Sequence, residues 1–420
     1  ILNLKQNYPE GIGLLEKDLR TRLNKILQIS KNHSHLIEQN QALKNCFAEM
    51  LNPEKVMVSI DLKESSISLA ELKVVSEVLP SSNIHSVDLR GNSILAQDAG
   101  WLFEAVRNSH VKFLNLAENS IAEGVSNLGE LLANSELSYL DLSLNSLEIQ
   151  GIKSIACSLS NSNLTSLKLE GNSICGAMLS SLLSGIPGSK LKLLDLSRNS
   201  IGDLDAEALS KVLPNSSLEN LHLNWNSISD SGTSFIAKVL PDCPIKALYL
   251  DFNSIAQEGA QALADALPKS KVTLLSLKSN SLCSEGVVAL AKFLENSKVV
   301  SLNLAKNMVS DKGAKALANS FSKLSDLNLK SNQITKEGAL DIALAIPNSK
   351  ITSLNLANNF IEANGAVSIA ESLPNSKLKQ LNLDCNSIKN QGAIALAKGL
   401  KNLTHLSIKQ DSIKRKGLQA

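Results

Sequence analysis

Three residues have the side chains that a hydrolase uses as nucleophile, base and acid: Ser197, His222 and Asp195. Asp195 and His222 are 27 residues apart, a spacing that recurs along the chain and places both in one column of a predicted parallel sheet, with Ser197 diagonal to them. Hydrolysis also needs donors for an oxyanion and a site that excludes water. An open sheet provides neither, so we expect polar recognition at these residues.

Other catalytic and metal-binding patterns are absent from the sequence. There is no GxxxxGK[ST] or HExxH motif and no zinc-ligand spacing, and the segment 185–190, GIPGSK, lacks the interval of a phosphate-binding loop. His33 and His35 have no cysteine or carboxylate at ligand spacing, which favours a solvated loop between two helices. We therefore predict no catalytic residue, no metal and no cofactor.

The chain is built from a repeated unit, seen clearly in residues 218–241. Its first half has the spacing LxxLxLxxNxI, which alternates as a strand does and then turns, with Leu218, Leu221, Leu223, Asn226 and Ile228. Its second half has helical spacing. In the next unit this is seen at Ala260, Leu263, Ala264 and Leu267, before Pro268 ends the helix.

Asparagines equivalent to Asn226 recur in twelve units, almost always 27 residues apart. Ser65 and Asp411 hold this position in two degenerate end units, which makes fourteen. An asparagine side chain has two N–H donors and an acceptor, so at a strand exit it can bond backbone groups of its own and adjacent units. We assign a structural role to this ladder: Asn92, Asn119, Asn145, Asn172, Asn199, Asn226, Asn253, Asn280, Asn307, Asn332, Asn359 and Asn386.

Over residues 56–420 these units resemble the leucine-rich-repeat family, in its ribonuclease-inhibitor-like subtype. The resemblance implies an α/β solenoid with a parallel sheet on one face and helices on the other. Strands lie about 4.8 Å apart and helices about 8–10 Å apart, so the array should curve as a horseshoe with the sheet on its concave face. Residues 1–55 lack the repeat and carry two apolar stripes at helical spacing, which predicts a helical N-terminal cap. The last unit stops at residues 416–420, where earlier units only begin their helix, so we expect either more chain beyond Ala420 or a partner that covers this edge.

Composition narrows the partner class. The formal net charge is +2 and only 3% of residues are aromatic, so nucleic acid is an unlikely partner. No run of 18 apolar residues exists, and the N-terminal residues are not typical of a signal peptide, so we expect no membrane association. Six scattered cysteines, with no CxxC pair, favour a reducing cytoplasmic compartment.

Large exposed aromatic residues predict a partner site near Asn199, Asn226 and Asn253. Trp225 and Phe252 each precede a ladder asparagine on consecutive units, where a core role is excluded by their phase. Such residues dominate binding energy at interfaces. The alternative is that the two rings only pack on each other. The predicted site comprises Arg198, His222, Trp225, Tyr249, Asp251 and Phe252, with an acidic column from Asp141 to Asp195 that attracts a basic rim of the partner.

The regular units and their PNS-type return segments also resemble bacterial leucine-rich-repeat proteins, including virulence effectors that act in the host cytosol. This resemblance implies a non-enzymatic scaffold that binds a protein on its concave face, here a host protein. One alternative is a small-GTPase regulator similar to Ran GTPase-activating proteins, in which Arg90 or Arg198 would stabilise phosphoryl-transfer charge. Another is an enzyme inhibitor similar to ribonuclease inhibitor, whose cysteine-rich, strongly acidic character is missing here.

Overall fold

The computed structural model describes residues 25–26, 28–50, 59–122 and 128–413. The chain folds into two compact units, the first comprising residues 1–173 and 177–194, the second residues 174–176 and 195–420. Each unit is a solenoid in which one strand and one helix alternate. The chain passes between the units after Ser173, within helix α8, Gly176–Leu183, and within strand β6, Leu193–Asp195.

In the first unit the strands pair in parallel and in chain order, with Ser59 opposite Ser86 and Ser86 opposite Phe113. Its strands are β1 Ser59–Asp61, β2 Ser86–Asp88, β3 Phe113–Asn115, β4 Tyr139–Asp141 and β5 Ser166–Lys168. Its helices are α2 Ser34–Gln39, α3 Gln41–Met50, α4 Leu69–Val78, α5 Ala96–Arg107, α6 Leu128–Asn134, α7 Ile149–Ser158 and most of α8.

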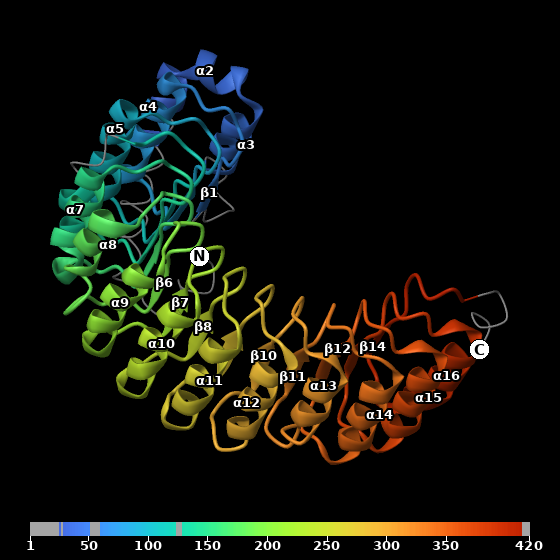
Figure 1. The fold of residues 1–420 in the computed structure, drawn as a ribbon. Helices are drawn as coiled ribbons and strands as arrows, with labels where there is room; N and C mark the ends of the chain where they lie inside the picture. The colour runs from blue at the N-terminus through green and yellow to red at the C-terminus, as the bar shows by residue number, and fades with distance from the viewer. Residues whose placement is uncertain (1–24, 27, 51–58, 123–127, 414–420) are drawn as a thin grey trace, which may run out of the picture. The chain divides into compact units, whose positions relative to one another are not determined.

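The second unit continues the same alternation, with helices along one side and strands along the other (Figure 1). Its strands are β7 Asn220–His222, β8 Ala247–Tyr249, β9 Leu274–Ser276, β10 Ser301–Asn303, β11 Asp326–Asn328, β12 Ser353–Asn355, β13 Gln380–Asn382 and β14 His405–Ser407. Its helices are α9 Asp203–Val212, α10 Asp230–Val239, α11 Gln257–Ala266, α12 Ser284–Leu294, α13 Ser310–Ala318, α14 Lys336–Ala345, α15 Glu362–Ser372 and α16 Lys389–Gly399.

The apolar pattern of the sequence places the core between strands and helices. In β7, Leu221 is fully buried while Asn220 and His222 on either side are half-buried, as strand alternation predicts. The stripe of α11 is fully buried, and α11 ends at Ala266, before a 3₁₀ turn over Leu267–Lys269 that contains Pro268. The predicted alternation of strand and helix around a shared apolar core is therefore confirmed.

The repeated asparagines join neighbouring coils through backbone groups. Asn332 is fully buried, and its Nδ2 donates to the carbonyl of Leu304 at 2.8 Å. Its Oδ1 accepts from the backbone N–H groups of Asn307 and Val309 at 3.2 and 3.3 Å. Such bonds satisfy buried backbone groups that the short strands leave unpaired.

A second inter-coil link was not predicted from the sequence. Asp203, at the first residue of α9, accepts from the backbone N–H groups of Ser229 and Gly232 at 2.8 and 3.0 Å. Asp230 does the same for Ala256 and Gly259 at 2.7 and 2.9 Å. Each carboxylate therefore caps the helix of the next coil, a position where the helix dipole favours negative charge.

The predicted cap at residues 1–55 is described only in part. Helices α2 and α3 lie against the first coil, and Asn40 Nδ2 donates to the carbonyl of Ser65 at 3.0 Å. Leu43 and Phe47 of the second predicted stripe are buried. Most of the first stripe, the domain boundary at residue 55 and the last residues, 414–420, lie outside the described part of the chain, so those expectations stay predictions.

Within the described residues, no helix has the length and apolar character needed to cross a membrane. Each of the six cysteines is a free thiol, and burial raises the pKa of the Cys243 thiol to about 12. Cys243 lies in the core and Cys157 at the surface.

Candidate functional site

The candidate site lies where strands β6, β7 and β8 end. Here the residue before each ladder asparagine has a left-handed backbone, with φ of 56° at Arg198, 56° at Trp225 and 55° at Phe252. The Trp225 N–H donates to the carbonyl of Asp251 at 2.8 Å, and the Phe252 N–H donates to that of Lys278 at 2.8 Å. These backbone bonds bring the side chains of successive coils next to each other.

Four of these side chains form one column, which we call the aromatic stack: Arg198, Trp225, Phe252 and Lys278. The two rings are nearly parallel, at 8°, with centroids 3.7 Å apart. The Arg198 guanidinium carbon lies 5.0 Å from the Trp225 ring centre, and Lys278 Nζ lies 5.1 Å from that of Phe252. A cation over each outer ring face is attracted by the negative charge of that face.

The stack explains the orientation of the rings but leaves Trp225 accessible. Nearly half of the Trp225 surface, 48%, is exposed, and Phe252 is half-buried. The rings do pack on each other, as the alternative prediction states. That contact does not remove Trp225 from solvent, so it remains available to a partner.

His222 and Tyr249 form a second pair on the adjacent strand face. Their ring centres are 4.2 Å apart with an interplanar angle of 35°. Asp251, two residues beyond Tyr249, accepts hydrogen bonds from Ser276 Oγ and, at 2.8 Å, from the Lys278 N–H. Burial raises the pKa of the Asp251 carboxyl, and these bonds offset that effect only in part.

Asp141 and Asp195, which the sequence predicts as an acidic column facing the partner, have little exposed surface. Both residues are buried, at 8% exposure each. Asp195 accepts from the Ser197 N–H at 2.9 Å, and Asp141, which lies in the first unit, accepts from the Ser143 N–H at 3.0 Å. A short carboxylate at the strand end bonds the backbone two residues on, so it turns away from solvent. Any contribution of the two residues to binding stays a prediction.

The side chains considered for catalysis are held in other contacts. Asp195 Oδ2 lies 3.8 Å from His222 Nδ1, beyond hydrogen-bond distance, and Ser197 is buried. Arg90 bonds Glu118 at 2.5 Å, and Arg198 lies against Trp225. No cluster of three or more potential metal ligands occurs among the residues that the structure describes.

Sequence reasoning missed Lys278, the cation at the far end of the stack. Lys278 stands two residues before its ladder asparagine, whereas Arg198 stands one residue before, so a search at a single repeat position omits it. The backbone bond from Phe252 to Lys278 shows that these two positions meet between coils. Comparing both positions in neighbouring units would have found it.

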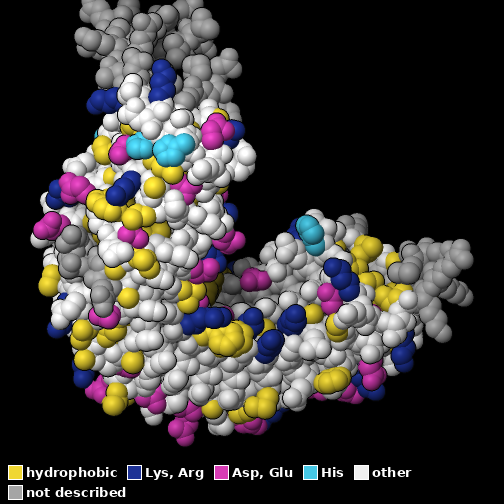
Figure 2. All heavy atoms as spheres, turned by 90° about the horizontal axis from the view of Figure 1, so that it is seen from above, with side chains coloured by type: hydrophobic (Ala, Val, Ile, Leu, Met, Phe, Trp, Pro, Cys, Tyr) yellow, Lys and Arg dark blue, Asp and Glu magenta, His cyan; other side chains and the backbone are white. Residues whose placement is uncertain are grey.

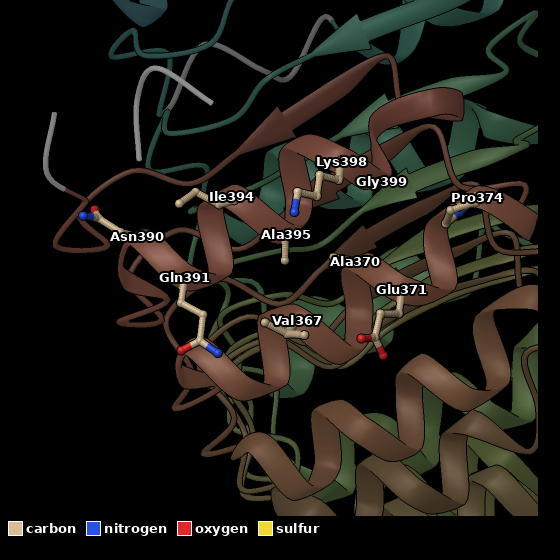
Figure 3. Close-up of a pocket in the computed structure, with 10 residues that line it drawn as sticks. All are labelled: Val367, Ala370, Glu371, Pro374, Asn390, Gln391, Ile394, Ala395, Lys398 and Gly399. Carbon is tan, nitrogen blue, oxygen red and sulfur yellow. The ribbon is translucent and has the colours of Figure 1, made fainter. Parts of the chain in front are cut away.

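A groove of about 800 Å³ lies on the helix side of the second unit, between α15 and α16 (Figure 3). Its lining includes Val367 and Glu371 of α15, and Ile394 and Lys398 of α16. It has no exposed aromatic residue and no group of converging polar side chains. The aromatic stack is therefore the better candidate site.

Comparisons with known proteins agree with the architecture. The Leucine Rich repeat family model matches residues 189–210, 215–237, 295–318, 322–343, 348–370 and 375–397, so these units are leucine-rich repeats. No curated protein matches the chain in sequence.

Among solved structures, an internalin of Listeria monocytogenes is similar over 84% of this chain and 86% of its own, with a TM-score of 0.51 and 22% identity. A leucine-rich-repeat protein of Leptospira interrogans matches 89% of this chain and 94% of its own, with a TM-score of 0.48 and 17% identity. The repeats, the strand topology and the similarity to the internalin define a leucine-rich-repeat fold.

Proposed function

We propose that this protein is a non-enzymatic scaffold that binds a protein partner at the strand ends of β6–β8. The observation that carries the proposal is Trp225, half-exposed yet fixed between Arg198 and Phe252. A rigid aromatic residue loses little conformational entropy on binding, and Trp, Tyr and Arg supply most of the energy at protein interfaces. The pair of His222 and Tyr249 extends the surface along the strands.

We further propose that the partner is a host protein and that binding takes place in the host cytosol. The units resemble those of bacterial effectors in sequence, which supports a host protein as the partner and the host cytosol as the place of action. The scattered cysteines favour the same reducing compartment. A GTPase regulator has less support, because the arginines that it would use contact Glu118 and Trp225.

Site-specific cross-linking tests the proposal. A photoreactive phenylalanine analogue at Phe252 should cross-link a discrete host protein in cytosolic extract, identified by mass spectrometry. The same analogue at Trp101, which is also half-exposed but lies in the first unit, serves as the matched control. Equal cross-linking of the same protein from both positions, or none from Phe252, would place the partner site elsewhere.

A further inference from the structure

Basic residues line the strand ends beside the aromatic stack. The N–H of Phe252 donates to Lys278, that of Ser279 to Ala305 at 2.8 Å, and that of Lys306 to Lys330 at 2.7 Å. Together with the bonds from Arg198 to Asn224 and from Trp225 to Asp251, these bonds run along the ends of consecutive strands. We call the cations on this row, Arg198, Lys278, Lys306 and Lys330, the basic strip. Arg198, Lys306 and Lys330 are exposed and Lys278 is half-buried.

Acidic residues are few at the positions that form this strip. At the two positions before each ladder asparagine, from Arg198 to Lys330, Asp251 is the single acidic residue. It is half-buried, and its carboxylate already accepts bonds from Ser276 and from the Lys278 N–H. In the space-filling view, Lys and Arg side chains lie beside a group of hydrophobic side chains (Figure 2). These strand-end positions therefore carry more positive than negative charge, although the whole chain carries only +2.

Both faces of each aromatic ring are already occupied, so a ligand cannot stack on them. One face of Trp225 meets Phe252 and the other meets Arg198, while the faces of Phe252 meet Trp225 and Lys278. Only ring edges remain, and the edge of an aromatic ring carries the positive part of its quadrupole. A nucleobase needs a free ring face to stack upon. The positive ring edges and the cations together favour an anionic partner. Because no ring face is open for stacking, they favour one without nucleobases.

We infer that the partner binds through an acidic segment of a protein, laid along the basic strip with its carboxylates toward Lys278, Lys306 and Lys330. This inference rests on the proposed function and adds the chemistry of the partner. Neighbouring strands lie about 4.8 Å apart, so the six coils from β6 to β11 span about 24 Å. An extended segment of about seven residues, at about 3.3 Å each, covers that length.

Fluorescence anisotropy with charge-matched probes tests the inference on the full chain. The probes are a labelled (Glu-Ala)₆ peptide, its (Lys-Ala)₆ counterpart, and an oligouridine with six phosphates. The variant is Lys306→Glu with Lys330→Glu, since neither residue belongs to the stack. Its matched control is Lys238→Glu with Lys269→Glu, the same change of charge at exposed lysines of α10 and of the turn after α11.

The Glu peptide should bind the unmodified chain at low salt, and raised salt should weaken this binding. It should bind the Lys306/Lys330 variant at least tenfold more weakly. It should bind the control variant with unchanged affinity. The Lys peptide should not bind. Comparable binding of the Lys peptide, or equal loss in both variants, would overturn the inference. So would tighter binding of oligouridine that Trp225→Ala abolishes, because that result shows base stacking. Cross-linking from Phe252 to a partner without an acidic segment refutes this inference alone and leaves the proposed function standing.

Discussion

Two bulky residues stand at a backbone position that suits glycine. The residue before the ladder asparagine has φ above 50° throughout, and the equivalents of Trp225 include Gly91 and Gly171, with φ of 68° and 67°. A left-handed conformation costs a residue with Cβ about 1–2 kcal/mol. What Trp225 and Phe252 give to folding at these positions is their mutual stacking and their contacts with Arg198 and Lys278. We propose that their further role is binding.

The end coil offers a test of the ladder at a single atom. Asp411 replaces the asparagine there: its Oδ1 accepts from the Asn386 N–H at 2.6 Å, but its Oδ2 is buried with no hydrogen-bond partner in the described structure. Asp411→Asn restores the amide donor, so the free energy of unfolding at pH 7 should rise by about 1 kcal/mol or more. Urea denaturation measures this.

The pH dependence of stability checks this interpretation of Asp411. Burial raises the pKa of the Asp411 carboxyl, so the folded protein binds this proton more tightly than the unfolded chain. Stability is then greatest when the carboxyl is protonated, and falls as pH rises from the usual range of an aspartic acid through the raised folded pKa. The advantage of Asp411→Asn should accordingly shrink in acid. An advantage that is constant from pH 3 to pH 7 would contradict this account.

At the scale of the helix, the sequence predicts where elements lie better than how coils are joined. Burial alone explains the alternation of Leu221 and Leu223 and the helical stripe that includes Leu263. All three side chains are buried, as expected. The caps from Asp203 and Asp230 depend on side-chain direction between coils, which single-residue patterns do not contain. The same limit explains the acidic column, since spacing places Asp195 on the strand face but not its bond to Ser197.

Substitution of alanine for two different glycines should change the free energy of unfolding in opposite directions. A Cβ at Gly259 would lie 2.6 Å from the capping Oδ1 of Asp230, whereas a Cβ at Gly100 in α5 meets no atom within 4 Å. Gly259→Ala should lose about 1–3 kcal/mol through this clash. Gly100→Ala should gain about 0.5–1 kcal/mol from reduced chain entropy. Thermal unfolding of both variants compares them, and a stabilising Gly259→Ala would show that the cap is dispensable.

The molecule as a whole is a repeat array, in which each coil contacts mainly its neighbours. Damage to one ladder asparagine should therefore stay local. Asn332→Ala leaves the buried N–H groups of Asn307 and Val309 and the carbonyl of Leu304 without their bonds, at about 1–3 kcal/mol per group. Hydrogen exchange should accelerate around β10–β12 and change little around β7 and β8. Uniform acceleration across the second unit would show long-range cooperativity instead.

The central claim is that the aromatic stack anchors a protein partner. Its most direct test is calorimetric affinity for the protein that cross-links through Phe252, measured for Trp225→Ala with Phe252→Ala and for the control Trp101→Ala. Trp101 is 44% exposed with Lys73 Nζ 4.0 Å from its ring centre, so it matches Trp225 in exposure and cation contact. The double variant should bind at least tenfold more weakly, with nearly unchanged thermal unfolding, and Trp101→Ala should bind normally. Wild-type affinity in the double variant would contradict the claim.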